Sequence, residues 1–186
     1  MASPMLVIVS GPAGSGKTTL AHEVARALGC PAICRDEIKE GMAHATPGFT
    51  PGPDDPLTRR TLSTFFDVLD LLLRAGVTVV AEAAFQDRLW RPGLEPLTKL
   101  ASLRVIRCGV DQSIARDRIA HRVAVNPRRA AHEDHRLLRE LEAGASGFEA
   151  FDPITLDAPT IFVDTSDGYH PGLADIVAFI DSAAGG

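Results

Sequence analysis

Residues 11–18 of the sequence read Gly-Pro-Ala-Gly-Ser-Gly-Lys-Thr and match the pattern G-x-x-x-x-G-K-[ST]. An apolar, strand-like run at 5–10 precedes this motif, and apolar residues with helical spacing follow it at 17–28. In such a loop, glycines let successive backbone N–H groups turn toward a phosphate, and the positive end of the helix dipole adds to the attraction. The motif therefore predicts a phosphate-binding loop between a strand and a helix, and this unit constrains the fold more than any other feature.

The side chains of this loop have distinct expected roles. Lys17 is expected to bridge the β- and γ-phosphates of a nucleotide, the Thr18 hydroxyl to ligate Mg²⁺, and Thr19 to touch the α-phosphate. The remaining phosphate contacts are expected from Gly11, Ala13, Gly14, Ser15 and Gly16. The alternative, a glycine-rich turn with a chance lysine, disagrees with the flanking strand and helix. No lysine follows an asparagine, as a guanine-reading N-K-x-D motif would require, so ATP is the predicted nucleotide.

Apolar runs alternate with helix-periodic stretches along the rest of the chain. This alternation predicts an α/β fold, a doubly wound parallel sheet in a single domain spanning 1–186. Strands are expected at 5–10, 32–34, 77–81, 103–108 and 160–163. Helices are expected at 17–28, 36–43, 57–74, 87–100 (interrupted by two prolines), 114–123, 132–143 and 173–180. The Pro- and Gly-rich stretch 46–56 is expected to be a loop.

The composition restricts partners and compartment. The net charge is −5, so the overall field does not attract nucleic acid or an anionic membrane, although a local basic cleft is compatible with it. The three cysteines include no C-x-x-C pair, which argues against a disulfide framework or a cysteine-rich zinc site. The longest early apolar run is too short for a signal peptide or a membrane span. We therefore expect a cytoplasmic protein that does not bind membranes.

Asp36 follows the second predicted strand directly and is the candidate general base. Transfer of a phosphoryl group to a hydroxyl needs a carboxylate that accepts the hydroxyl proton, at the carboxyl end of a strand beside the phosphate-binding loop. Lys39 lies one helical turn further on and is expected to share the side of Asp36. The alternative is that Asp36 only caps the second helix.

With these residues, most of the chain resembles a group of P-loop kinases that includes polynucleotide 5′-kinases, zeta toxins and chloramphenicol phosphotransferases. The shared segment is Arg35-Asp36-Glu37-Ile38-Lys39. The resemblance implies that Asp36 is the base, that the acceptor lies along this segment from Arg35 to Lys39, and that Lys39 contacts an acceptor phosphate. It also implies that Glu82, at the end of the third strand, supports Lys39. Ala83 stands where nucleic-acid kinases commonly have a hydroxyl residue, which disfavours a polynucleotide acceptor.

An arginine-rich segment at about 116–143 corresponds to the lid of such kinases. Arg118 and Arg122 are four residues apart and share a helix face. The resemblance implies that both contact the nucleotide phosphates and that Arg122 stabilises transition-state charge. The alternative is an exposed charged helix. The pair His132 and His135 is interpreted as part of a solvated lid helix, since no third metal ligand is evident.

Three further residues are weaker candidates. Arg88 is placed to reach an anionic acceptor, with a solvated helix face as the alternative. Thr165 and Ser166 follow the fifth strand, where related kinases wrap the adenine, and an ordinary strand-to-helix turn is the alternative.

The predicted function is transfer of the γ-phosphate of ATP, with Mg²⁺, to a hydroxyl of a small-molecule acceptor. A polynucleotide 5′-hydroxyl is the second possibility. A plain P-loop ATPase or nucleotide-dependent binding module is the third, and a toxin-like kinase acting on a nucleotide sugar is the fourth.

Overall fold

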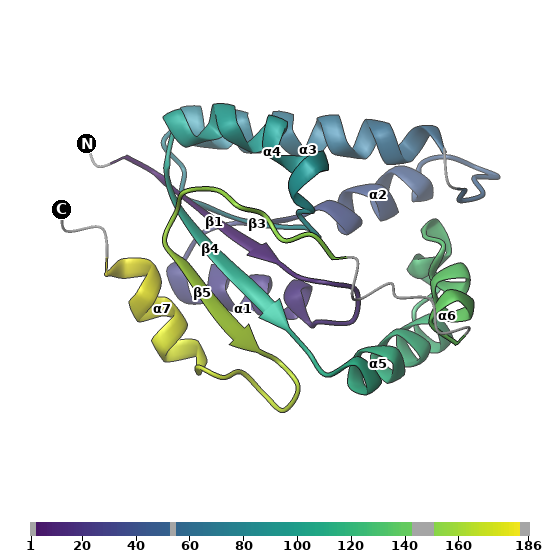
Figure 1. Ribbon diagram of the computed structural model, residues 1–186. Helices are drawn as coiled ribbons and strands as arrows, with labels where there is room; N and C mark the ends of the chain where they lie inside the picture. The colour runs from purple at the N-terminus through teal and green to yellow at the C-terminus, as the bar shows by residue number, and fades with distance from the viewer. Residues whose placement is uncertain (1–2, 53–54, 143–150, 183–186) are drawn as a thin grey trace.

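The computed structural model describes residues 3–52, 55–142 and 151–182 (Figure 1). The elements are β1 (Met5–Ser10), α1 (Lys17–Leu28), β2 (Ala32–Cys34), α2 (Arg35–His44), α3 (Pro56–Arg74), β3 (Val79–Glu82), α4 (Asp87–Leu94), η1 (Glu95–Lys99), β4 (Ser102–Gly109), α5 (Gln112–Val125), η2 (Pro127–Ala131), α6 (Asp134–Glu142), β5 (Thr160–Asp164) and α7 (Leu173–Asp181).

The five strands form one sheet in the order β2-β3-β1-β4-β5, and every pairing is parallel. The predicted α/β fold with a five-stranded parallel sheet is therefore confirmed. The first strand lies at the centre, where Val9 is in register with Glu82 on one side and with Ile106 on the other. Strands β2 and β3 lie on one side of β1, and β4 and β5 lie on the other, so the strand order reverses at β1. In open α/β sheets ligands bind at such a switch point, outside the carboxyl ends of the strands.

Helices cover both faces of the sheet, with α3 and α4 on one side and α1 and α7 on the other (Figure 1). Alternation along β1 serves both layers, because Leu6 and Ile8 join the cluster under α3 and α4, while Val7 and Val9 join the cluster under α1 and α7. All four side chains are fully buried. This two-sided burial explains why the strand is a continuous apolar run.

Several element ends differ from the predicted ones for local reasons. Helix α5 begins two residues earlier than predicted because the Asp111 carboxylate accepts a hydrogen bond from the Ser113 N–H. Helix α3 begins at Pro56, behind the Asp55 cap. The predicted helix at 87–100 divides into α4 and a 3₁₀ helix that has Pro96 in its first turn. Position 143, where the predicted lid ends, lies outside the described residues.

Within the described ranges, no helix combines the length and apolar character needed to cross a lipid bilayer.

Candidate active site

The phosphate-binding loop connects β1 to α1 and requires glycine at two positions. Gly14 and Gly16 have φ angles of 76° and 68°, in the left-handed region. A Cβ at Gly14 would also lie 2.6 Å from the Ala115 carbonyl oxygen of α5. The cap residue of α1 is Gly16, which has no side chain to accept a hydrogen bond from the first N–H groups of the helix. These N–H groups are therefore left available to an anion. The loop therefore has the conformation that anion binding at a helix N-terminus needs.

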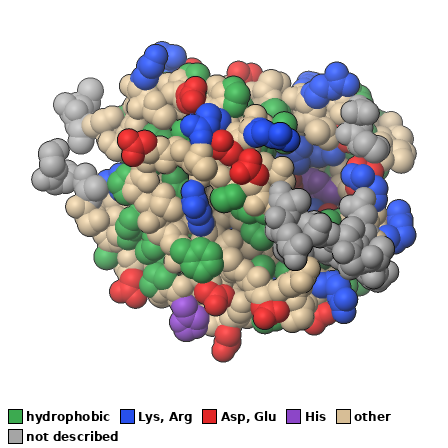
Figure 2. All heavy atoms as spheres, in the orientation of Figure 1, with side chains coloured by type: hydrophobic (Ala, Val, Ile, Leu, Met, Phe, Trp, Pro, Cys, Tyr) green, Lys and Arg blue, Asp and Glu red, His purple; other side chains and the backbone are tan. Residues whose placement is uncertain are grey.

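A cleft of about 1110 Å³ opens beside this loop, between α2 and the lid helices. Predicted site residues that line it are Gly14, Gly16, Lys17, Thr18, Thr19, Asp36, Arg118, Arg122 and Thr165. Figure 2 shows Lys and Arg side chains beside a histidine at this end of the molecule. Further lining residues, not predicted as site residues, are Glu37, Glu40, Gly41, His44, Asn126, Arg129, Gly168 and Tyr169.

The other predicted site residues lie outside this lining, and they are Gly11, Ala13, Ser15, Arg35, Lys39, Glu82, Arg88 and Ser166. Arg88 is exposed on α4. The expectation that it contacts an acceptor in this cleft is therefore not supported by its position. Its charge is solvated instead, as the alternative for this residue predicted.

Glu82 ends β3 next to the phosphate-binding loop and is 2% exposed. Its Oε1 lies 3.8 Å from Lys17 Nζ, and the Lys17 ammonium also donates to the Pro12 carbonyl at 3.3 Å. Burial raises the pKa of the Glu82 carboxyl, although Lys17 and Thr18 oppose the shift. The expected support of Lys39 by Glu82 is thus wrong, because the ionic partner of Glu82 is the lysine of the loop.

Asp36 lies in the first turn of α2, and Cys34 rather than Asp36 occupies the cap position. Its Oδ1 accepts a hydrogen bond from Arg35 Nη1 at 3.0 Å, and its Oδ2 accepts one from Arg129 Nη1 at 3.0 Å. Burial alone would raise the pKa of Asp36, but His132, which is protonated at the low pH where Asp36 titrates, and the charges of Arg129, Arg35 and Lys17 hold it well below its usual range. The carboxylate is therefore ionised at neutral pH and faces the nucleotide cleft, and the alternative that it merely caps the helix does not hold.

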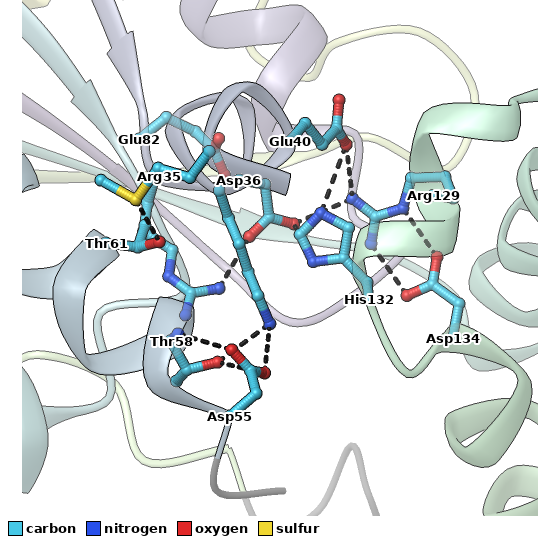
Figure 3. Close-up of polar contacts among 12 residues, drawn as sticks. Arg35, Asp36, Glu40, Asp55, Thr58, Thr61, Glu82, Arg129, His132 and Asp134 are labelled. Carbon is cyan, nitrogen blue, oxygen red and sulfur yellow. Dashed lines mark hydrogen bonds and ion pairs between the residues drawn. The ribbon is translucent and has the colours of Figure 1, made fainter. Parts of the chain in front are cut away.

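A network of ionic side chains joins the lid to α2 (Figure 3). Arg129 donates to both oxygens of Asp134 at 2.8 Å, and its third nitrogen reaches Asp36 and, at 3.4 Å, Glu40. Arg122 donates to the same Asp134 at 3.1 Å. One guanidinium thus connects the candidate base in α2 to Asp134 of α6, which also accepts from Arg122 of α5.

His132 belongs to this network, so its interpretation as part of a solvated lid helix is wrong. Its side chain is 8% exposed, with Nε2 3.3 Å from Glu40 Oε1 and Nδ1 4.0 Å from Asp36 Oδ2. Burial, with Arg129 and Lys39, lowers the pKa of His132 to about 4, although Asp36 and Asp134 oppose the shift. The histidine is therefore neutral at physiological pH.

Lys39 is turned away from the cleft toward the start of α3. Its ammonium is buried and donates to Asp55 Oδ2 and to Thr58 Oγ1, both at 2.9 Å. Asp55 also caps α3, since its Oδ1 accepts from the Thr58 N–H at 2.8 Å. Lys39 therefore joins two helices, which does not fit the expected contact with an acceptor phosphate.

Arg118 and Thr165 hold the far side of the phosphate-binding loop. Arg118 Nη2 donates to the Thr165 carbonyl at 2.6 Å, and Nη1 donates to the Gly14 carbonyl at 3.4 Å. The Thr165 hydroxyl donates to the Ser15 carbonyl at 2.8 Å. The Ser166 hydroxyl accepts from the Asp111 N–H at 2.9 Å. Adenine contact by Thr165 and Ser166 stays a prediction, and both hydroxyls are already used inside the protein.

With this geometry established, comparison with known proteins identifies the family. The family model described as an AAA domain matches residues 6–144, which is most of the chain. The chain belongs to the AAA domain family. Comparison with curated proteins gives no match.

Solved structures agree with this assignment. A putative kinase from Chloroflexus aurantiacus is 25% identical, with a TM-score of 0.85 and coverage of 97% of this chain and 98% of the other. Shikimate kinase from Bacteroides thetaiotaomicron is 18% identical, with a TM-score of 0.54 and the same two coverages of 97% and 98%. A chain of the Pnkp1/Rnl/Hen1 RNA repair complex is 19% identical, with a TM-score of 0.56, and the match covers 83% of this chain and 49% of that one. The AAA domain described here therefore has a P-loop kinase-like fold, and the predicted resemblance to small P-loop kinases is confirmed.

Proposed function

We propose that the protein transfers the γ-phosphate of ATP to a hydroxyl group of a small-molecule acceptor. The observation that carries this proposal is the position of the Asp36 carboxylate, which is ionised and lines the same cleft as Lys17 and Thr18. In a plain ATPase a carboxylate at this place would act on water, and the dependence of ADP production on an acceptor separates the two activities. In the proposed reaction the acceptor oxygen attacks the γ-phosphorus, its proton passes to Asp36, the bond to the β,γ-bridging oxygen breaks, and ADP leaves.

The cleft residues divide the remaining work between them. The loop amides and Lys17 would hold the phosphates, and Arg118 and Arg122 would approach from the lid side. The residues present also fit a magnesium ion, because Glu82 Oε2 is buried and has no hydrogen-bond partner among the described residues. Thr18 and Glu82 would hold the ion, which would offset phosphate charge.

A second cavity supports the small-molecule acceptor. It measures about 510 Å³, lies between the loop after α2 and η2, and shares Glu40 and His44 with the nucleotide cleft. Among the described residues that line it, the apolar ones are Ala43, Pro47, Phe49, Pro127, Ala130 and Ala131, and none is Lys or Arg. A neutral acceptor with an apolar part suits such a lining.

A polynucleotide 5′-end is the second candidate acceptor, and the Arg35-Asp36-Glu37-Ile38-Lys39 segment favours it. Single-stranded nucleic acid is normally bound along a basic groove with stacking aromatic side chains. On the face seen in Figure 2, basic and acidic side chains are interspersed. Lys39, the residue expected to hold the phosphate, is instead paired with Asp55. These observations favour the small molecule.

The direct test is transfer of labelled γ-phosphate in the presence of two acceptor pools, one of neutral small alcohols and one of 5′-hydroxyl oligonucleotides. We expect label in the first pool and acceptor-dependent ADP production. Label found only in the oligonucleotides would contradict the small-molecule acceptor and show that the acceptor is a polynucleotide 5′-hydroxyl. ADP production at the same rate with and without either pool would support a plain ATPase.

Asp36→Asn tests the assignment of the base. We expect a loss of about 10²- to 10⁴-fold in transfer with little change in affinity for a non-hydrolysable ATP analogue, because the substitution removes the proton acceptor and leaves the loop intact. Asp117→Asn, at an exposed position of α5, is the matched control. Transfer within a fewfold of the wild type in Asp36→Asn would remove Asp36 from the mechanism.

A further inference from the structure

Three side chains of different chemistry converge beside the cleft, which one of them, Glu37, also lines. His22 comes from α1, Cys34 ends β2, and Glu37 lies in the first turn of α2. One ligand atom of each lies within 4.8 Å of the other two. His22 Nε2 is 2.7 Å from Glu37 Oε1, and Cys34 Sγ is 3.6 Å from His22 Nε2. We propose that these three residues bind one divalent transition-metal ion of the zinc type.

The separations suit a tetrahedral ion. Zinc bonds of about 2.0–2.3 Å to nitrogen, oxygen and sulfur place neighbouring ligand atoms about 3.3–3.8 Å apart. The distance from Cys34 to His22 already meets this condition. The pair of His22 and Glu37 has to open by under about 1 Å, and both side chains can do so because they are 42% and 50% exposed. Three protein ligands would leave the fourth position to water.

The donor set determines the class of metal. Imidazole nitrogen and thiolate sulfur favour zinc, cobalt or copper, whereas magnesium and calcium take oxygen ligands. The site is therefore chemically distinct from the magnesium position proposed at Thr18 and Glu82. His22 lies twelve positions before Cys34, on a different element, and only one of the three ligands is a cysteine. The cysteine spacing in the sequence therefore argues against a zinc site and gives no indication of this one.

The surroundings of Cys34 are negative and dry. Burial, followed by the charges of Glu82 and Glu37, raises the pKa of the Cys34 thiol well above its usual range. The free thiol is therefore protonated, and the two carboxylates attract a cation to it. Metal binding forms the metal–sulfur bond, breaks the S–H bond and releases one proton to water.

Binding there would tie α1, which begins at Lys17, to the start of α2, which carries Asp36. Glu37 also lines the nucleotide cleft. The proposal does not depend on the proposed kinase activity, because its test measures metal binding directly.

Cobalt(II) is the probe, added to the full chain after treatment with a chelator. We expect one equivalent to produce a near-ultraviolet thiolate-to-cobalt absorption with visible bands of a tetrahedral ion, and excess Mg²⁺ to leave both unchanged. The chain supplies matched controls, because all three cysteines are free. The absorption should vanish in Cys34→Ser and persist in Cys30→Ser and Cys108→Ser.

His22→Ala provides a second variant, because its partly exposed position tolerates the change even if Cys34→Ser folds poorly. We expect a cobalt affinity at least about tenfold weaker, and loss of the rise in melting temperature that Zn²⁺ gives the wild type. No thiolate absorption at one equivalent of cobalt in the wild type, or an equal absorption in Cys34→Ser or His22→Ala, would overturn the proposal.

Discussion

Lys17 is the residue whose replacement tests the nucleotide site most directly. It reaches from the loop to Glu82 and lines the cleft. Lys17→Ala should lower the transfer rate by about 10² or more, because it removes a preorganised charge at the phosphates. The measurement is single-turnover transfer of labelled phosphate. Lys99→Ala, at an exposed position of η1, should leave the rate unchanged, and an equal loss in both variants would contradict the assignment.

His132 provides a prediction about pH. Its pKa is lowered to about 4 in the folded protein from 6.5, so the unfolded chain binds a proton between these values and the folded chain does not. The free energy of unfolding should therefore fall as pH drops from 6.5 toward 4. Urea titrations of His132→Gln should show a smaller fall, by on the order of 2 kcal/mol at about pH 4.5. His135→Gln, at an exposed position, should behave like the wild type.

At the scale of helices, the buried pair of Lys39 and Asp55 joins α2 to α3. Asp55→Ala should destabilise the protein by about 3–5 kcal/mol, because it leaves a buried ammonium without its counter-ion. Lys39→Met should cost less, since Asp55 keeps its hydrogen bonds to Thr58. The double variant should recover part of the loss of Asp55→Ala.

Chemical denaturation of these three variants measures the effect, and transfer kinetics separate stability from acceptor binding. Asp70→Ala, which breaks an exposed pair with Arg74, is the control and should change little. If Lys39→Met weakens acceptor binding with no change in stability, the expected acceptor contact by Lys39 would be reinstated.

Elements with strong local signals were predictable from sequence. The observed bounds of β1 and α1 match the predicted ones, because a continuous apolar run leads into the glycine-rich loop and Gly29 ends the helix in the left-handed conformation. Where a single side chain sets the boundary, as Asp111 does for α5, the prediction missed by two residues. Periodicity defines the middle of an element better than its ends.

The candidate site was predictable where a motif or strand end positions a residue, as for Lys17, Thr18 and Asp36. Arg129 and His132 contact Asp36 although more than ninety positions of sequence separate them from it. Arg129 lies in the short 3₁₀ helix η2 and His132 directly follows it, and this stretch has no apolar periodicity that would have predicted its position. The direction of Lys39 depends on Asp55, which a sequence pattern does not reveal. The long-range ionic partners therefore needed the three-dimensional structure.

For the whole molecule, one sheet supports two apolar layers. Leu69 lies in the layer under α3 and α4, with Trp90, and Ile176 lies in the layer under α7. Leu69→Ala and Ile176→Ala should each cost about 2–5 kcal/mol. Fluorescence of Trp90, the single tryptophan, and far-ultraviolet circular dichroism should report the same transition in both variants. An unchanged Trp90 transition in Ile176→Ala would contradict the expectation of one domain over 1–186.

The positions at which β1 begins and α7 ends have a practical consequence. This strand begins, and α7 ends, at the end of the molecule opposite the lid helices α5 and α6 (Figure 1). A bead, a sensor surface or a reporter protein attached through either terminus would therefore lie away from the cleft. Immobilised protein should exchange nucleotide and acceptor with the flowing solution, which makes screening of acceptor libraries on a surface practicable.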